Sequence, residues 1–190
     1  LAELNSLPEL EIESLLPINQ AIQNVTAELG ETPLIGFGGA PFTLASYLIE
    51  GGPSKELPIT RRLMKADPEL WNDILAWVAR ATSSFIRAQV LAGASALQLF
   101  DSWGGLLSPA EFEAFSLQYI RQIMTALKDE TLTILFAKGA WFALDKMSET
   151  GANALGNDWC VSASVGRLLA GDNITFQGNF DPAGLLSRVA

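Results

Sequence analysis

Residues 93–105 read Gly-Ala-Ser-Ala-Leu-Gln-Leu-Phe-Asp-Ser-Trp-Gly-Gly, and they show the structural unit from which the chain is built. Gly93 ends a long pattern that predicts a helix, with Asp67 as its N-cap and Pro68 at its first position. Residues 94–100 form a short apolar run typical of a buried strand, and polar residues and glycines follow it. The chain therefore passes from a helix into a strand whose carboxyl end carries reactive side chains.

The same order of elements recurs on both sides of this stretch. Ser108, with Pro109 at the first helical position and Glu111 at the third, forms a capping box that predicts the next helix. The predicted helices cover 13–29, 67–92, 108–128, 141–150 and 165–169, and the predicted strands cover 33–38, 94–100, 132–136, 154–158 and 174–177. Asp181 and Pro182 predict the start of a further helix. Strands and helices alternate five times, which predicts parallel strands with right-handed helical crossovers.

The architecture of this α/β fold is only partly defined by the pattern. The apolar runs 34–35 and 134–136 are typical of strands buried on both faces. Periodicity does not separate an open, doubly wound sheet from a closed barrel, and five units are fewer than the eight of a (β/α)8 barrel. No linker-like or low-complexity stretch divides the chain, so residues 1–190 are expected to form a single domain.

Composition excludes several classes of site. The chain is 49% hydrophobic and 17% charged, as in ordinary globular proteins, and no apolar stretch approaches the ~20 residues of a membrane helix. One cysteine and no histidine exclude an internal disulfide, a Cys/His zinc site and a Ser-His-Asp triad. Cys160 is expected to be a small buried residue in a reducing compartment. No export signal follows Leu1, so a cytoplasmic location is expected.

Charge narrows the choice of partners. The net charge of -9 argues against nucleic acid and against anionic membranes. An anionic small molecule remains compatible, because local arginines and backbone N–H groups bind anions inside acidic proteins.

Chemistry is expected at the carboxyl ends of the strands, where parallel α/β folds bind their ligands. Four of these ends carry functional residues or glycines, namely 36–47, 100–105, 156–159 and 177–182. Asp101 and Ser102 are the best placed, because they directly follow a strand.

Other features of these loops have two readings. The glycines at 36, 38 and 39 lack the G-x-G-x-x-G spacing of a dinucleotide site and suit a tight turn. Residues 50–55 form either a flexible loop or a substrate lid. Asp158 and Asp181 suit helix capping and ligand binding equally. Tyr47 alone suits a core aromatic as well as a catalytic group. Trp71 and Trp77 are expected in the core.

Residues 33–52 and 93–105 closely resemble the signature stretches of the uroporphyrinogen decarboxylase family. Residues 136–139, 156–159 and 177–182 match the family in order and spacing. The resemblance implies a (β/α)8 TIM barrel, present here in part, with the five strands as the third to seventh. It also implies a homodimer without metal or organic cofactor. The implied reaction removes carbon dioxide from the four acetate arms of uroporphyrinogen III, giving coproporphyrinogen III for haem biosynthesis.

The resemblance also implies roles for four residues. Tyr47 falls on the family's active-site tyrosine and is expected to be catalytic and substrate-binding. Ser102 falls on a substrate-binding serine, and Phe37 and Phe100 fall on aromatic positions that line the pocket. The family's N-terminal arginines, catalytic aspartate and histidine lie outside these residues, and Asp101 is not that aspartate. The 190-residue chain alone is therefore expected to be inactive and poorly folded.

Two departures from the family pattern are mild. Asn157 stands where an apolar residue is usual, and Pro53 replaces a glycine in the loop that follows Gly52. Two alternative functions remain open. One is a zinc-dependent methyltransferase of the same superfamily that transfers methyl groups between a corrinoid and a thiol. The other is a non-catalytic relative that binds tetrapyrroles.

Overall fold

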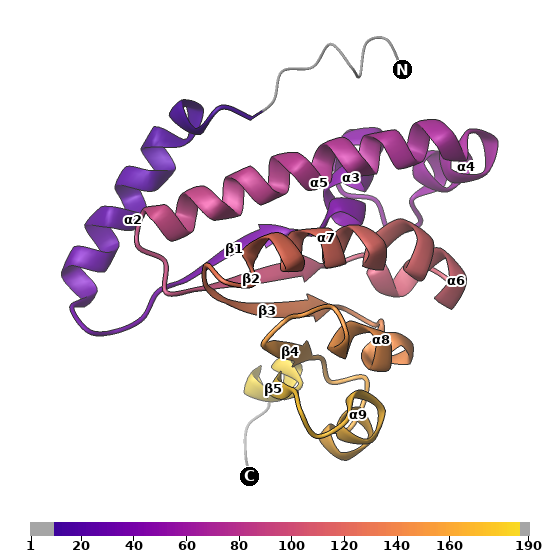
Figure 1. The fold of residues 1–190 in the computed structure, drawn as a ribbon. Helices are drawn as coiled ribbons and strands as arrows, with labels where there is room; N and C mark the ends of the chain where they lie inside the picture. The colour runs from indigo at the N-terminus through magenta and orange to yellow at the C-terminus, as the bar shows by residue number, and fades with distance from the viewer. Residues whose placement is uncertain (1–9, 187–190) are drawn as a thin grey trace.

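The computed structural model describes residues 10–186 as helices arranged around one parallel sheet (Figure 1). The strands are β1 (Ile35–Gly39), β2 (Ala96–Asp101), β3 (Leu132–Ala137), β4 (Ala154–Asn157) and β5 (Thr175–Gly178). The α-helices are α2 (Leu16–Leu29), α3 (Pro41–Glu50), α4 (Pro58–Ala66), α5 (Pro68–Leu91), α6 (Pro109–Phe112), α7 (Gln118–Leu127), α8 (Leu144–Ser148) and α9 (Ala163–Ala170). Shorter helical segments are η1 (Ile12–Leu15), η2 (Gly104–Leu106), the π-helical η3 (Glu113–Leu117), η4 (Trp141–Ala143) and η5 (Pro182–Leu186).

Strand order identifies the architecture. The five strands lie side by side in the order β1-β2-β3-β4-β5, and each neighbouring pair is parallel. A doubly wound sheet reverses its direction of growth at a switch point, so its strand order is not sequential. An unbroken sequential order is that of a TIM barrel. The predicted fold class is confirmed, and the described residues contain five of the eight βα units.

The two faces of the sheet differ in burial. Alternate residues such as Leu97, Leu99 and Leu135 point toward the helices and are buried. On the opposite face Phe37 is 63% exposed and Leu132 is 62% exposed. The prediction of burial on both faces is wrong for the run 34–35, because Ile35 is 44% exposed. The run 134–136 is buried or half-buried throughout. In a closed barrel that face is filled by side chains from all eight strands, and the described residues supply only five.

The predicted helix starts are confirmed by their hydrogen bonds. Asp67 Oδ1 accepts the backbone N–H of Leu70 at 3.0 Å, which caps α5. Ser108 and Glu111 form both bonds of the capping box that opens α6. The predicted helix near Asp181 is a short 3-10 turn, η5.

Helices α3 and α4 were not predicted from the sequence. Each of the two helices begins with a proline and contains no glycine, but the glycines at 36, 38, 39, 51 and 52 flank α3 and favoured loops over 36–47 and 50–55. In each helix the proline, Pro41 or Pro58, occupies the first turn, where its missing N–H costs nothing. Gly51 ends α3 in the left-handed conformation with φ of 73°, which glycine adopts without a steric penalty.

The core lies between the sheet and helices α5 and α7, which cover the same face in Figure 1. Trp71 is fully buried, as predicted, and its ring meets the edge of Phe42 at 6.0 Å between centroids. Ile120 and Ile123 add fully buried side chains from α7. Trp77 is only partly buried and packs against this core. None of the helices in residues 10–186 combines the length and apolar character required to cross a membrane.

Cys160 corrects a further prediction. Its side chain is exposed, whereas the sequence suggested a buried one. Cys160 lies in the turn after β4, where its backbone N–H is donated to Asp158 Oδ1 at 2.8 Å. The turn fixes the backbone of Cys160 while its side chain points outward. The usual burial of cysteine therefore led to a wrong prediction at this position.

The face of the sheet that carries Phe37 and Leu132, called the open face below, is not covered by helices within residues 10–186. We therefore expect residues 1–190 expressed alone to self-associate. Phe37 and Leu132 expose apolar surface that water contacts unfavourably, so association buries it. We expect light scattering to detect oligomers and a hydrophobic dye to bind. Replacing both residues by serine reduces the two signals. A monomeric 190-residue chain with no dye binding would contradict this prediction.

Candidate functional site

The carboxyl ends of the strands meet at one edge of the sheet because all five are parallel. There the end of β1 leads into α3, and the end of β2 leads into Ser102 and Trp103. The loop after β3 contains Lys138 and Gly139, and the loop after β4 contains Asp158. The structure thus gathers the loops that the sequence singled out.

An aromatic row crosses the open face near this edge. The rings of Phe37 and Phe100 meet edge to face at 6.2 Å, and those of Phe100 and Phe136 at 5.8 Å. Phe100, Phe136 and Gly156 are register partners on β2, β3 and β4. A Cβ at Gly156 would lie 2.8 Å from Phe136, so the absent side chain leaves room for that ring. Together these rings form an apolar wall.

Phe136 belongs to this wall, although sequence reasoning did not select it as a site residue. The sequence could have indicated this position, because side chains alternate along a strand and Phe136 lies two residues after Ile134, on the same face of β3. The register that sets it beside Phe100 could be read only from the structure.

Phe37 is held by a side chain from α5. Gln89 Oε1 accepts the backbone N–H of Phe37 at 3.1 Å, and Gln89 Nε2 donates to its carbonyl at 2.8 Å. Gln89 is buried and passes over Gly36, where a Cβ would lie 2.7 Å from its oxygen. This two-bond clamp satisfies both backbone groups of Phe37 and sets its position on β1.

Tyr47 and Ser102 are brought together through Trp103. Tyr47 lies in the last turn of α3, is 37% exposed, and meets the Trp103 ring at 6.1 Å between centroids. Ser102 is exposed and directly follows β2. Tyr47 therefore lies beside the loop that carries Ser102, although 55 positions separate them in the chain.

Asp101 lies beneath this loop and is completely buried. Its Oδ1 accepts the Thr43 hydroxyl at 2.6 Å, and its Oδ2 accepts the Ser116 hydroxyl at 2.5 Å. Burial raises the pKa of the Asp101 carboxyl above its ordinary value, and the hydrogen bonds from Ser116 and Thr43 oppose that rise. Asp101 thus faces the protein interior and has no surface to offer a ligand.

The glycines of this loop allow a close approach. A Cβ at Gly104 would lie 2.6 Å from Asp101 Oδ2, and a Cβ at Gly105 would lie 2.4 Å from the Lys138 carbonyl oxygen. Gly105 also donates its backbone N–H to that carbonyl at 3.1 Å. The loops after β2 and β3 are therefore packed backbone against backbone.

Comparison with known proteins assigns a family to this arrangement. The family model of uroporphyrinogen decarboxylase (URO-D) matches residues 1–189. The chain belongs to the uroporphyrinogen decarboxylase family. Uroporphyrinogen decarboxylase of Christiangramia forsetii is 45% identical over 177 residues, which cover 93% of this chain and 52% of that relative. The enzyme of Streptomyces avermitilis is 46% identical over 187 residues, covering 98% of this chain and 53% of that relative.

The chain spans about half the length of these curated relatives. Among solved structures, a methyltransferase from Methanosarcina mazei superposes with a TM-score of 0.77. It is 22% identical, and the match covers 87% of this chain and 48% of that protein. At this identity the likeness concerns the fold alone.

Asp158 and Asp181, for which the sequence left capping and ligand binding open, make different contacts. Asp158 is buried and accepts the backbone N–H groups of Gly139 at 2.6 Å and Cys160 at 2.8 Å. It ties the loops after β3 and β4 together, so the helix-capping interpretation is wrong for it. Asp181 accepts the N–H of Ala183 at 2.9 Å and caps the short η5, as one reading expected.

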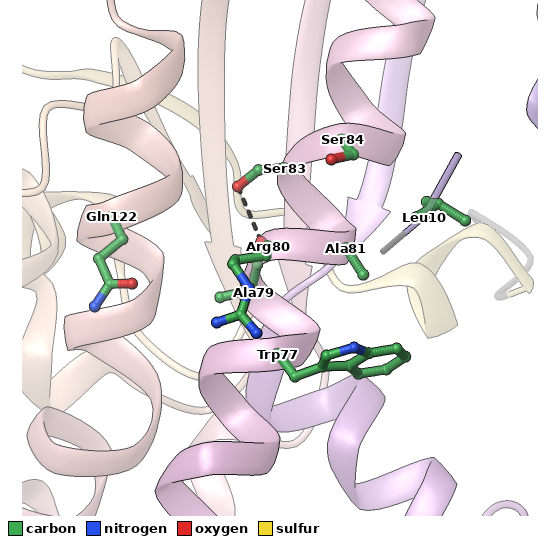
Figure 2. Close-up of a pocket in the computed structure, with 8 residues that line it drawn as sticks. All are labelled: Leu10, Trp77, Ala79, Arg80, Ala81, Ser83, Ser84 and Gln122. Carbon is green, nitrogen blue, oxygen red and sulfur yellow. Dashed lines mark hydrogen bonds between the residues drawn. The ribbon is translucent and has the colours of Figure 1, made fainter. Parts of the chain in front are cut away.

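Two hollows are lined in part by α5. One of about 380 Å³ is lined mainly by the middle of α5, with Gln122 of α7 and Leu10 beside it (Figure 2). In Figure 2 the Ser83 hydroxyl donates to the Ala79 carbonyl, and no strand end contributes to the lining. A larger, more apolar hollow of about 640 Å³ lies between α3 and α5 and includes Tyr47, Gly51 and Gly52. Only the larger hollow reaches a predicted site residue.

Gly105→Ala is expected to destabilise the fold by about 1–3 kcal/mol, because the new Cβ collides with a carbonyl oxygen that cannot move aside independently. Gly166→Ala is the matched control, since its Cβ would press on the side-chain amide of Asn157 at 3.1 Å, touch Phe176 at an ordinary 3.7 Å, and meet no backbone atom. Alanine also favours the helix interior of α9. Thermal melting of the complete gene product measures both changes. Equal melting midpoints for the two variants would refute the close-packing argument.

We expect the stability of the protein to depend on pH through the buried carboxyl of Asp101. Because its pKa is raised above 3.8 in the folded chain, the native state binds this proton more readily than the unfolded state. Its contribution to the free energy of unfolding is therefore greatest below pH 3.8 and falls as pH rises to the folded-state pKa. The melting midpoint of the parent protein minus that of Asp101→Asn should fall across this interval.

Glu113 is expected to change stability with pH in the direction opposite to Asp101, and Glu113→Gln tests this. Hydrogen bonds from Lys146 and then Arg121 lower the pKa of Glu113 below 4.5. Its contribution is present above pH 4.5 and is lost as pH falls through the folded-state pKa. The melting midpoint of the parent protein minus that of Glu113→Gln should rise with pH. The same direction of change for Glu113→Gln and Asp101→Asn would contradict the opposite pKa shifts of the two carboxyls.

Proposed function

We propose that the complete gene product containing this chain decarboxylates the four acetate arms of uroporphyrinogen III to give coproporphyrinogen III. The observation that carries the proposal is the match of the uroporphyrinogen decarboxylase model to residues 1–189. The gathering of Tyr47, Ser102 and the aromatic row at one edge of the sheet supports it.

The chemistry fits a site without an organic cofactor. Protonation of a pyrrole carbon beside the acetate arm makes the ring an electron sink, so the bond to the carboxylate breaks and carbon dioxide leaves. A proton is then delivered to the carbon of the arm that lost the carboxylate, and the proton first added to the ring carbon is released, which restores the neutral pyrrole. The protein must stabilise positive charge on the pyrrole and deliver that proton.

The described residues supply the binding part of this task. The wall formed by Phe37, Phe100 and Phe136 offers an apolar surface to the macrocycle. Ser102 provides a hydroxyl for an acetate or propionate arm, and Tyr47 donates a hydrogen bond to a substrate carboxylate or orients the catalytic carboxylate. Lys138, whose ammonium lies 5.8 Å from the Trp159 ring centre, adds positive charge at this edge.

We also propose a cytoplasmic homodimer, following the family resemblance. No observation favours the zinc-dependent methyltransferase over the decarboxylase, because the methyltransferase likeness concerns the fold alone.

The test is an anaerobic assay of the complete gene product with uroporphyrinogen III, followed by chromatographic separation of the porphyrins after oxidation. Tyr47→Phe and Ser102→Ala are each expected to lower kcat/KM by about 10- to 100-fold, the cost of losing a hydrogen bond to a charged group. The matched controls are Tyr119→Phe, whose hydroxyl donates to Asn72, and Ser148→Ala on α8.

Activity of both site variants equal to that of the controls would remove Tyr47 and Ser102 from the site. Tight porphyrinogen binding without carbon dioxide release by the parent protein would instead establish the non-catalytic alternative and overturn the proposal.

A further inference from the structure

We infer that Asp101 is a positioning residue that holds the Tyr47 helix and the Ser102 loop in a single relative geometry. The inference rests on the proposed function and deepens it, because it explains how two site residues from separate βα units are kept in register. Asp101 is fully buried, so it acts through its neighbours and does not touch the substrate.

The carboxylate joins three segments of the chain. Thr43 on α3 donates its hydroxyl to Oδ1, and Ser116 in η3 donates its hydroxyl to Oδ2. The backbone N–H groups of Trp103 and Gly104 in the loop also donate to it. The Trp103 N–H additionally lies 3.2 Å from Thr43 Oγ1, which links the loop directly to α3.

These bonds close a ring of contacts that includes Tyr47. Thr43 and Tyr47 are four residues apart on α3, so they lie on the same side of that helix. Tyr47 meets the ring of Trp103, whose backbone is bonded to Asp101 and Thr43. Rotation or sliding of α3 relative to the Ser102 loop would break either the hydroxyl bond or the ring contact.

A carboxylate is a costly way to fill space, which argues for a geometric role. Burying a charge disfavours folding unless hydrogen bonds replace its hydration, and an apolar side chain would fill the same volume at lower cost. Here directional donors from α3, η3 and the loop surround Asp101. Such bonds are short and specific in direction, so they select one arrangement of the three segments.

The experiment uses the complete gene product and removes one donor at a time. Thr43→Val deletes the hydroxyl without changing the shape of the side chain, and Thr43→Ser restores the hydroxyl. We expect Thr43→Val to lower kcat/KM by about 10- to 100-fold, the effect of misplacing groups by up to about 1 Å, and Thr43→Ser to recover most of that loss. Ser116→Ala should act in the same direction.

Thr133→Val is the matched control. Thr133 is as buried as Thr43, and its hydroxyl bonds Asn153 near the amino end of β3, away from the site. It should lower the melting midpoint about as much as Thr43→Val and leave kcat/KM within about twofold of the parent.

A double-mutant cycle separates positioning from general destabilisation. If Asp101 and Thr43 act through Ser102, Thr43→Val should cost much less activity when Ser102 is already alanine. Equal costs in both backgrounds, or a Thr43→Val effect no larger than that of Thr133→Val, would overturn the inference. Inactivity of the parent protein toward uroporphyrinogen would refute the proposed function itself, which is a distinct outcome.

Discussion

The buried carboxylate of Asp101 constrains how the elements around the candidate site can be arranged. It accepts hydroxyl donors from two segments and backbone donors from the loop beside it. Removing any donor would leave part of a buried charge without compensation, so the network favours an all-or-none arrangement. The positions of α3, the loop after β2 and the helix that follows are therefore mutually dependent.

The sequential parallel sheet supplies the frame for this network. Because each strand pairs with the next one in the chain, every loop that leaves a carboxyl end emerges at the same edge. The open face then becomes an aromatic surface directly below those loops. Phe37 retains its place on β1 because the Gln89 clamp satisfies both of its backbone groups. Rigid strands thus carry the apolar wall, and the loops carry the polar groups.

Local chemistry made several features predictable. The caps at Asp67 and Ser108, the five strands and their parallel orientation follow from nearest-neighbour patterns and from alternation of elements. The failures have a common origin. Helices α3 and α4, the exposed face of the sheet and the outward side chain of Cys160 depend on what surrounds a segment. Proline and glycine content, or residue type, does not report those surroundings.

By itself the sequence determined the five strands, the helices other than α3 and α4, the parallel α/β class, the family resemblance and the loops that matter. Helix caps and strand periodicity are local, so a short window of residues contains their full physical cause. Only the tertiary structure decided that Asp101 bonds Thr43 and Ser116, that Phe136 joins Phe100, and that Tyr47 meets Trp103. Those contacts depend on strand register and helix packing. They join residues distant in the chain, whose separation in space no local pattern encodes.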